Sequence, residues 1–168
     1  PGSVDEVQAI VRLAADQKLA LVPSGGRTGL SAGSVACNGE IVLALDRMNS
    51  ISDFNPMDRT VRCGAGVITE QLQQFAANQG LYYPVDFASA GSSQIGGNIS
   101  TNAGGIKVIR HGMTRDWVAG LKLVTGTGEL LDLNQGLIKN NAGYDLRQLA
   151  IGAEGTLGIV VEATMQLD

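Results

Sequence analysis

Residues 89–105, SAGSSQIGGNISTNAGG, combine residue types that can bind an anion without a charged side chain. Glycine lacks a Cβ and tolerates positive φ, so backbone N–H groups can approach a ligand closely, and nearby hydroxyls and amides add neutral donors. The only large apolar residues are Ile95 and Ile99, so we expect that this segment cannot build a hydrophobic core. We predict that it binds a diphosphate. The alternative is a flexible linker, which Gly/Ser-rich runs commonly form.

Two further glycine-rich stretches occur far from the first, at residues 24–34 (SGGRTGLSAGS) and 152–158 (GAEGTLG). Two separate loops can hold one diphosphate from opposite sides, while the third covers another part of the ligand. Neither GxxxxGK[ST] nor a GxGxxG placed between a strand and a helix is present, which argues against a P-loop kinase and a Rossmann dehydrogenase.

The composition narrows the class of protein further. Twelve Lys and Arg against 16 Asp and Glu give a formal net charge of −4, and no basic cluster suggests nucleic-acid binding. No apolar run reaches membrane-spanning length, and the start does not resemble a signal peptide, so we expect a cytoplasmic protein with reduced Cys37 and Cys63. Because the chain begins at Pro1 directly before a helix signal, we expect it to be a piece of a longer protein.

The elements that must position these loops follow from periodicity and caps. Ser3 with Glu6 three residues later predicts a helix N-terminus. Periodicity then predicts helices over residues 4–17, 67–79 and 145–150, and strands over 20–22 (ending at Pro23), 41–45 (buried), 51–54, 60–63, 118–125, 129–133 and 158–165. This irregular alternation favours an α+β fold over a doubly wound sheet, with one lobe at about 1–64 and a second at about 65–168.

Four stretches carry a resemblance to a known family: PSGGRTGLSAG (23–33), IGGNISTNAGG (95–105), RHGMTRDWVAGLKLVTGTGELL (110–131) and NNAGYDLRQLAIGAEGTLGI (140–159). Together they resemble the PCMH-type FAD-binding domain of the vanillyl-alcohol oxidase/p-cresol methylhydroxylase flavoproteins. The nearest branch contains D-2-hydroxyglutarate dehydrogenase, D-lactate dehydrogenase and the glycolate oxidase FAD subunit. The resemblance implies a two-lobed α+β domain with FAD between the lobes and a C-terminal substrate domain that this chain lacks.

The resemblance also implies a set of cofactor-binding residues. One pyrophosphate loop would comprise Ser24, Gly25, Gly26, Arg27, Thr28 and Gly29. The diphosphate, ribityl and flavin side would comprise Gly91, Ser92, Gly96, Gly97, Asn98, Thr101, Asn102 and Gly104, with Pro84 and Asp86 just before it. Glu154, Gly155 and Ile159 would lie near the adenosine end, and Asn141 and Tyr144 are further candidates near the flavin.

Some relatives attach FAD covalently through a histidine at the position of Arg27, so an arginine there implies non-covalent FAD. Arg27 could contact phosphate or could be a solvated loop residue. His111, the single histidine, could be a catalytic base or a structural residue. The resemblance implies that the catalytic residues lie in the missing domain, and no metal site is predicted in this chain.

The resemblance implies an enzyme that transfers a hydride from the α-carbon of a D-2-hydroxyacid to flavin N5 and passes the electrons to a carrier protein or quinone. Two alternatives are another oxidoreductase on the same domain, of the alditol oxidase or enolpyruvyl-sugar reductase type, and a non-catalytic binding module.

Overall fold

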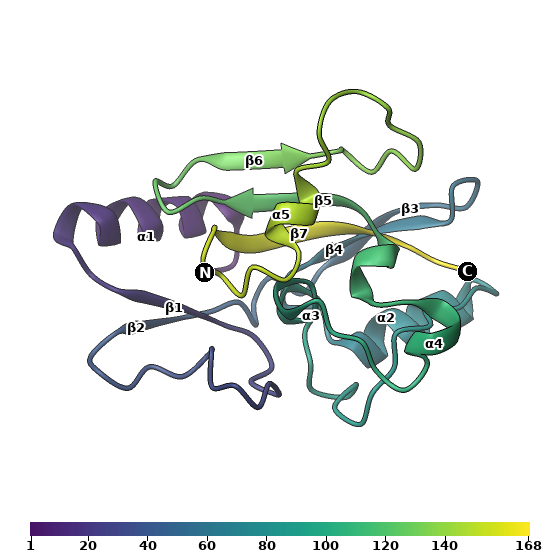
Figure 1. The fold of residues 1–168 in the computed structure, drawn as a ribbon, viewed down its shortest axis with the longest axis horizontal. Helices are drawn as coiled ribbons and strands as arrows, with labels where there is room; N and C mark the ends of the chain where they lie inside the picture. The colour runs from purple at the N-terminus through teal and green to yellow at the C-terminus, as the bar shows by residue number, and fades with distance from the viewer.

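The computed structural model describes residues 1–168 and contains two β-sheets. β1 (Leu21–Ser24) and β2 (Ile41–Ala44) form a parallel pair. The larger sheet is antiparallel with strand order β3-β4-β7-β5-β6 (Figure 1). Its strands are β3 (Ile51–Asn55), β4 (Thr60–Gly64), β5 (Val118–Val124), β6 (Leu130–Leu133) and β7 (Ile159–Gln166). The mixture of helices and a largely antiparallel sheet confirms the α+β class.

α1 (Val4–Gln17) forms where the cap and the periodicity predict it. The Ser3 hydroxyl accepts a hydrogen bond from the Glu6 N–H at 3.2 Å, and Lys18 ends the helix in the left-handed conformation. The helix lies beside one end of the larger sheet, close to β1 (Figure 1). There its buried Val7 and Val11 pack with β2 and with Val161 of β7. The first helix therefore ties the small sheet to the large one.

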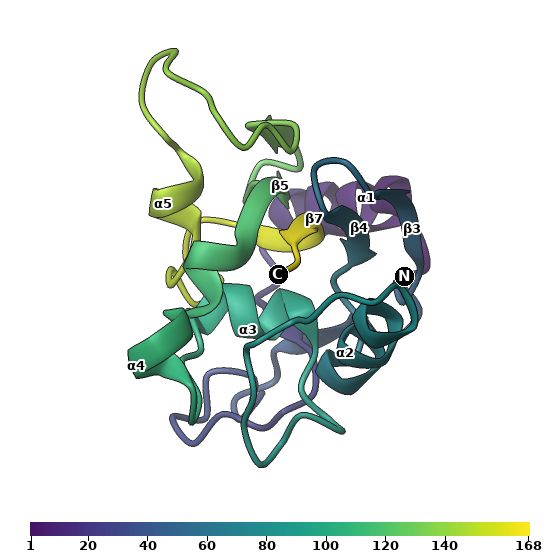
Figure 2. The ribbon, with the colours of Figure 1, turned by 90° about the vertical axis from the view of Figure 1, so that its right-hand side faces the viewer.

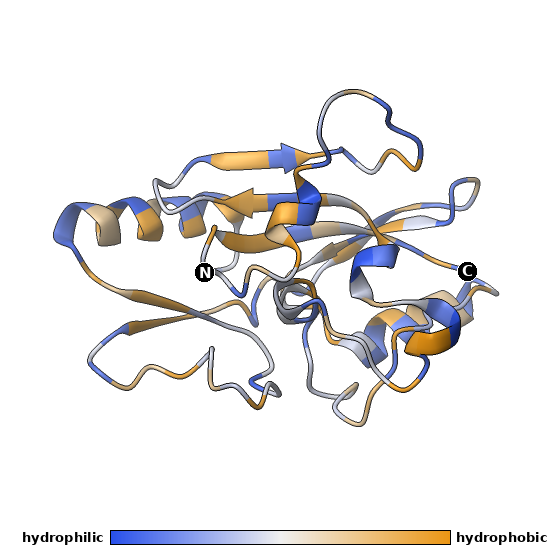
Figure 3. Ribbon diagram, viewed as in Figure 1, coloured by the Kyte–Doolittle hydropathy of each residue, from blue (hydrophilic) through white to orange (hydrophobic).

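α2 (Thr69–Asn78) and α3 (Ile95–Thr101) cover the larger sheet on the side that Figure 2 shows below the strands. Leu72 of α2 and Ile95 and Ile99 of α3 have no exposed surface and pack with residues of β4, β5 and β7 in one core cluster. Figure 3 shows that β5 and β7 are mostly hydrophobic; β5 is buried along nearly its whole length, and β7 alternates half-buried and buried residues from Glu162 on. The shorter helices are α4 (Val108–His111), the 3₁₀ helix η1 (Thr114–Trp117) and α5 (Arg147–Ala150).

Three of the local predictions are wrong. β2 is not a buried strand, because Ile41 and Val42 are each 45% exposed on a strand that pairs only with β1. Pro23 does not end the first strand but lies within β1, which is an edge strand and needs no ladder donor there. The 89–105 segment does join the core, because residues 95–101 coil into α3 and bury both isoleucines.

The predicted division near residue 64 falls at the end of β4, a strand of the larger sheet. The assignment of residues to two lobes therefore stays a prediction. What the fold does establish is that the loop after β1, the start of α3 and the turn before β7 converge, although they lie far apart in the sequence.

Candidate functional site

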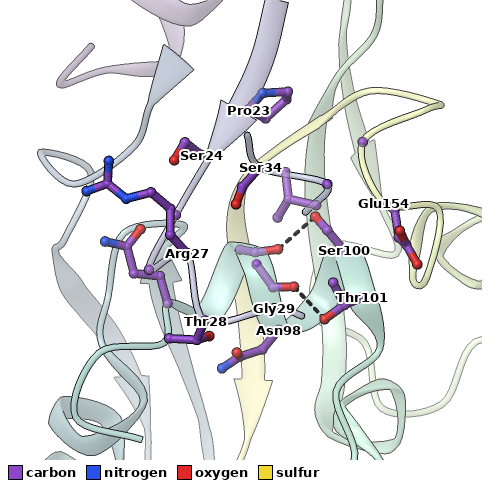
Figure 4. A pocket seen from close by; sticks show the side chains of 18 of the residues that line it. Pro23, Ser24, Arg27, Thr28, Gly29, Ser34, Asn98, Ser100, Thr101 and Glu154 are labelled. Carbon is purple, nitrogen blue, oxygen red and sulfur yellow. Dashed lines mark hydrogen bonds between the residues drawn. The ribbon is translucent and has the colours of Figure 1, made fainter. Parts of the chain in front are cut away.

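These three segments line a cavity of about 260 Å³ (Figure 4). Most of the predicted cofactor-binding residues lie in its wall: Ser24, Gly25, Gly26, Arg27, Thr28, Gly29, Gly96, Gly97, Asn98, Thr101, Glu154, Gly155 and Ile159. All three glycine-rich stretches contribute, which is the arrangement that the sequence predicted.

The 25–29 loop contributes unused backbone donors. None of the N–H groups of residues 25–29 donates a hydrogen bond to another protein atom. The loop is held at its base by the Leu45 N–H, which donates to the Ser24 carbonyl at 3.1 Å. A Cβ on residue 26 would come within 2.1 Å of the Ser92 carbonyl oxygen, so only glycine lets this loop lie against the segment before α3. Consecutive free N–H groups at a close approach form a concavity suited to an anion.

Two buried side-chain atoms in the cavity wall also lack a partner. The Ser24 hydroxyl belongs to a residue with 1% of its surface exposed, and the Gln94 Oε1 to one with 6% exposed. A buried polar atom without a hydrogen bond costs about 1–3 kcal/mol. Both atoms would gain a partner from a polar ligand in the cavity.

α3 uses its two glycines differently. A Cβ on Gly96 would come within 2.7 Å of the Ala65 Cβ, so this glycine allows α3 to pack directly on the chain after β4. A Cβ on Gly97 would meet no atom within 4 Å, and the Gly97 N–H has no protein acceptor. Gly97 therefore presents bare backbone to the cavity, whereas Gly96 belongs to the core.

The polar side chains of α3 are largely engaged within the protein. The Asn98 amide donates to Thr69 Oγ1 at 2.7 Å, and Thr69 in turn shares a 2.7 Å hydrogen bond with the Ser93 hydroxyl. The Ser100 and Thr101 hydroxyls donate to the carbonyls of Gly96 and Gly97 at 2.8 and 2.9 Å (Figure 4). Toward the cavity these hydroxyls keep lone pairs that can accept hydrogen bonds.

Arg27 and Glu154 are the charged residues of the cavity wall. Arg27 is exposed and has φ of 54°, and in Figure 4 its guanidinium points away from Ser100 and Thr101. The left-handed Glu154 is fixed by its N–H, which donates to the Ser100 carbonyl at 2.8 Å. The third glycine-rich stretch is thereby attached to the C-terminal half of α3.

The remaining predicted residues lie outside the cavity wall: Pro84, Asp86, Gly91, Ser92, Asn102 and Gly104. Asp86 pairs with Lys107 Nζ at 2.8 Å, and the hydrogen bond from this ammonium lowers the pKa of Asp86 below its ordinary value. Asn102 ends α3 in the left-handed conformation, and its side chain accepts from the Arg115 N–H at 3.0 Å. These two residues brace the segment that carries the site.

The further candidates from the sequence also lie elsewhere. Tyr144 is 95% exposed and, like Asn141, does not line the cavity. His111 accepts a hydrogen bond from the Trp117 indole through its carbonyl at 2.9 Å, and its ring lies 6.0 Å from that of Tyr82. No group of three or more His, Cys, Asp or Glu side chains is placed to hold a metal ion.

Sequence reasoning missed several wall residues. Leu45 and Ala65 come from outside the glycine-rich stretches, and no local signal marks them. Gln94 and Ser100 lie within 89–105, but the resemblance does not include them among the cofactor-binding residues. The hydrogen bond between Gln94 and Asp46 joins residues 48 positions apart, so no local sequence pattern could predict it.

FAD suits this site by its chemistry. Its diphosphate needs N–H donors, which the 25–29 loop and Gly97 supply, and its ribityl and ribose hydroxyls can both donate and accept hydrogen bonds. The unpartnered Ser24 hydroxyl can donate to a phosphate oxygen or pair with a hydroxyl, and the unpartnered Gln94 Oε1 can accept from a hydroxyl. Because residue 97 is glycine, no side chain occupies the part of the cavity beside its backbone. The residues present therefore fit the cofactor.

Comparison with known proteins identifies the class. A family model described as an FAD binding domain matches residues 1–134, so the chain belongs to this family of FAD-binding domains. This confirms the resemblance on which the cofactor prediction rested.

Particular relatives are similar over the whole chain. A D-2-hydroxyglutarate dehydrogenase of Stutzerimonas stutzeri (strain A1501) is 73% identical over 100% of this chain and 36% of its own length. A D-lactate dehydrogenase of Anaerostipes hadrus is 40% identical over 98% of this chain and 34% of its own length. The chain thus spans about a third of these curated relatives.

Solved structures agree on the fold. An alkyldihydroxyacetonephosphate synthase superimposes with a TM-score of 0.86 at 27% identity, over 100% of this chain and 33% of that one. The 6-hydroxy-D-nicotine oxidase from Arthrobacter nicotinovorans gives 0.82 at 29% identity, over 99% of this chain and 35% of that one. Proteins with different named activities therefore share this domain.

Proposed function

We propose that this domain binds FAD non-covalently, with the diphosphate between the 25–29 loop and Gly97. The observation that carries the proposal is the run of free N–H groups in the loop, which lies across the same cavity from the free Gly97 N–H. Neutral donors suffice because several N–H groups converge on one anion. Arg27 could add charge if its exposed side chain turned toward the phosphates.

Non-covalent attachment is supported by the chemistry of the wall. No histidine, cysteine or tyrosine lines the cavity, so the wall offers none of these side chains to bond the flavin ring. Cys37 is exposed outside the wall, and burial raises the pKa of the Cys63 thiol to about 12, which leaves it protonated and unreactive.

For the longer protein we propose oxidation of a D-2-hydroxyacid of the hydroxyglutarate, lactate or glycolate type, with electrons passed to a protein or quinone acceptor. Bound FAD would supply the hydride acceptor for the α-carbon of the substrate. The support is the 73% identity to a protein named D-2-hydroxyglutarate dehydrogenase and the 40% identity to one named D-lactate dehydrogenase. The residues of this domain would hold and orient the cofactor.

Two further assignments belong to the same proposal. The lobes would meet along the cavity, with FAD between them, and residues beyond the matched third would bind the substrate. No helix is long and apolar enough to cross a membrane. We also propose a cytoplasmic location for the protein. The relatives from Arabidopsis thaliana and Bos taurus are described as mitochondrial.

A visible absorption spectrum of the purified chain with added FAD tests the cofactor proposal. We expect a protein-bound flavin spectrum, with all of the colour released into the supernatant by acid precipitation. Colour that stays in the pellet would contradict non-covalent binding. If no flavin binds, the spectrum should be repeated on the full-length protein, and failure there as well would overturn the site.

A further inference from the structure

Gln94 has an amide whose orientation is fixed from outside the cavity. Its Nε2 donates to Asp46 Oδ1 at 2.7 Å, and a carboxylate oxygen can only accept. The amide nitrogen must therefore face Asp46, which leaves Oε1 as the free end. That oxygen is buried and has no hydrogen-bond partner.

The backbone around Gln94 is fixed as well. On one side the Thr69 N–H donates to the Ser93 carbonyl at 2.9 Å, and on the other the Ile95 N–H donates to the Val67 carbonyl at 2.8 Å. These bonds attach the residue to the first residue of α2 and to the chain just before this helix. Oε1 is therefore an acceptor in a defined place rather than a mobile side-chain end.

Gly25 controls the approach to this acceptor. A Cβ on residue 25 would lie 3.1 Å from Oε1, and the atoms nearest to that point all belong to Gln94. Residue 25 does not have positive φ, so the backbone itself does not demand glycine there. The missing Cβ leaves space beside Oε1, on the wall of the cavity.

An acceptor beside a carboxylate cannot favour phosphate oxygens, which are themselves anionic acceptors. It favours a hydrogen-bond donor, and most donors on FAD are the hydroxyls of its ribose and ribityl chain. We propose that Gln94 accepts a hydrogen bond from a ribose or ribityl hydroxyl of the bound cofactor, and that Asp46 is a positioning residue that holds the amide in the accepting orientation. This rests on FAD binding as proposed above, and it places a cofactor hydroxyl at Gln94, next to Gly25 at the start of the loop that would bind the diphosphate.

The first test measures ligand affinities of Gln94→Leu by flavin fluorescence and by competition. Loss of one buried hydrogen bond should weaken FAD about tenfold. Inorganic pyrophosphate, which has no sugar hydroxyl, should compete with unchanged affinity. Gln74→Leu, on an exposed part of α2, is the matched control and should bind FAD as the wild type does.

ADP identifies the source of the hydroxyl. If Gln94→Leu weakens ADP as much as FAD, the donor is on the adenosine half, which carries the ribose; if ADP is unaffected while FAD weakens, it is on the riboflavin half, which carries the ribityl chain. Equal weakening of FAD and pyrophosphate would mean that Gln94 only supports the loop, and wild-type FAD affinity would mean that it accepts nothing. Either result would overturn the proposal, whereas absence of FAD binding by the wild type, in the full-length protein as well, would overturn the cofactor site itself.

A double-mutant cycle separates the contact from a general effect on folding. Gly25→Ala should weaken FAD because the new methyl fills the approach to Oε1, and adding Gln94→Leu should then cost little more. Asp46→Ala frees the amide to turn and should weaken FAD by less than Gln94→Leu does. Additive losses for residues 25 and 94 would contradict the proposed contact. Thermal unfolding of each variant without ligand controls for stability.

Discussion

The 25–29 loop and α3 have similar compositions but opposite structural roles. Both are rich in glycine and hydroxyl residues, yet the loop makes no hydrogen bonds through its N–H groups while α3 is coiled, internally bonded and packed on the sheet. The difference lies in two isoleucines at i and i+4, Ile95 and Ile99, which give α3 an apolar side to bury. Glycine in the loop leaves donors free for a ligand, whereas glycine in α3 serves packing at one position and ligand access at the next.

Adjacent glycines give the strongest way to test this comparison. Gly97→Val should weaken FAD by about a hundredfold or more, because the side chain enters the diphosphate space, while the free energy of unfolding changes by less than about 1 kcal/mol. Fluorescence titration with FAD and urea denaturation measure the two quantities. Unaltered FAD affinity would show that the diphosphate does not lie beside Gly97.

The substitution at the neighbouring glycine should instead reduce the stability of the fold, with FAD binding affected only through the loss of folded protein. Gly96→Val places its Cβ 2.7 Å from the Ala65 Cβ in a packed core, so we expect a loss of about 2–3 kcal/mol in the free energy of unfolding. Any loss of FAD binding should then parallel the loss of folded protein. A stable Gly96→Val variant that fails to bind FAD would mean that both glycines line the ligand.

The buried amide of α3 should matter more than its exposed hydroxyl. Asn98→Ala removes the hydrogen bond to Thr69 at a residue only 4% exposed, and should cost about 1–3 kcal/mol. Thr101→Val removes an exposed hydroxyl that bonds within the helix, and should change stability by less than about 0.5 kcal/mol. Urea midpoints of the two variants compare them directly, and equal losses would contradict the ranking.

The smallest effect should come from the ion pair that braces the 89–105 segment. The Lys107 ammonium lowers the pKa of Asp86, so the pair stabilises the fold above the unfolded pKa, about 3.9, and this contribution is lost as the pH falls through the folded pKa. The thermal midpoint of Asp86→Asn should therefore fall less between pH 7 and pH 3 than that of the wild type. Asp16→Asn, on the exposed side of α1, is the control and should follow the wild type.

Local sequence was sufficient for the elements with strong short-range signals. The Ser3 cap and the apolar spacing determined α1, and the strand patterns at 51–54 and 60–63 predicted the two strands that pair as β3 and β4, because caps and strand patterns depend on a few consecutive residues. The motifs at 23–33, 95–105, 110–131 and 140–159 also predicted the family, and the match to residues 1–134 confirmed it.

Only the tertiary structure decided what each polar group does. The resemblance implied the same role for Gly96, Gly97 and Asn98, but packing on Ala65 buries Gly96, and the hydrogen bond to Thr69 engages the Asn98 amide within the protein. The sequence does not predict a role for Gln94, because the orientation of its amide depends on Asp46, which lies in the segment after β2. Composition determined which groups were available to bind FAD. Long-range packing decided which remained free, because a hydrogen-bonding group used inside the fold is no longer available to a ligand.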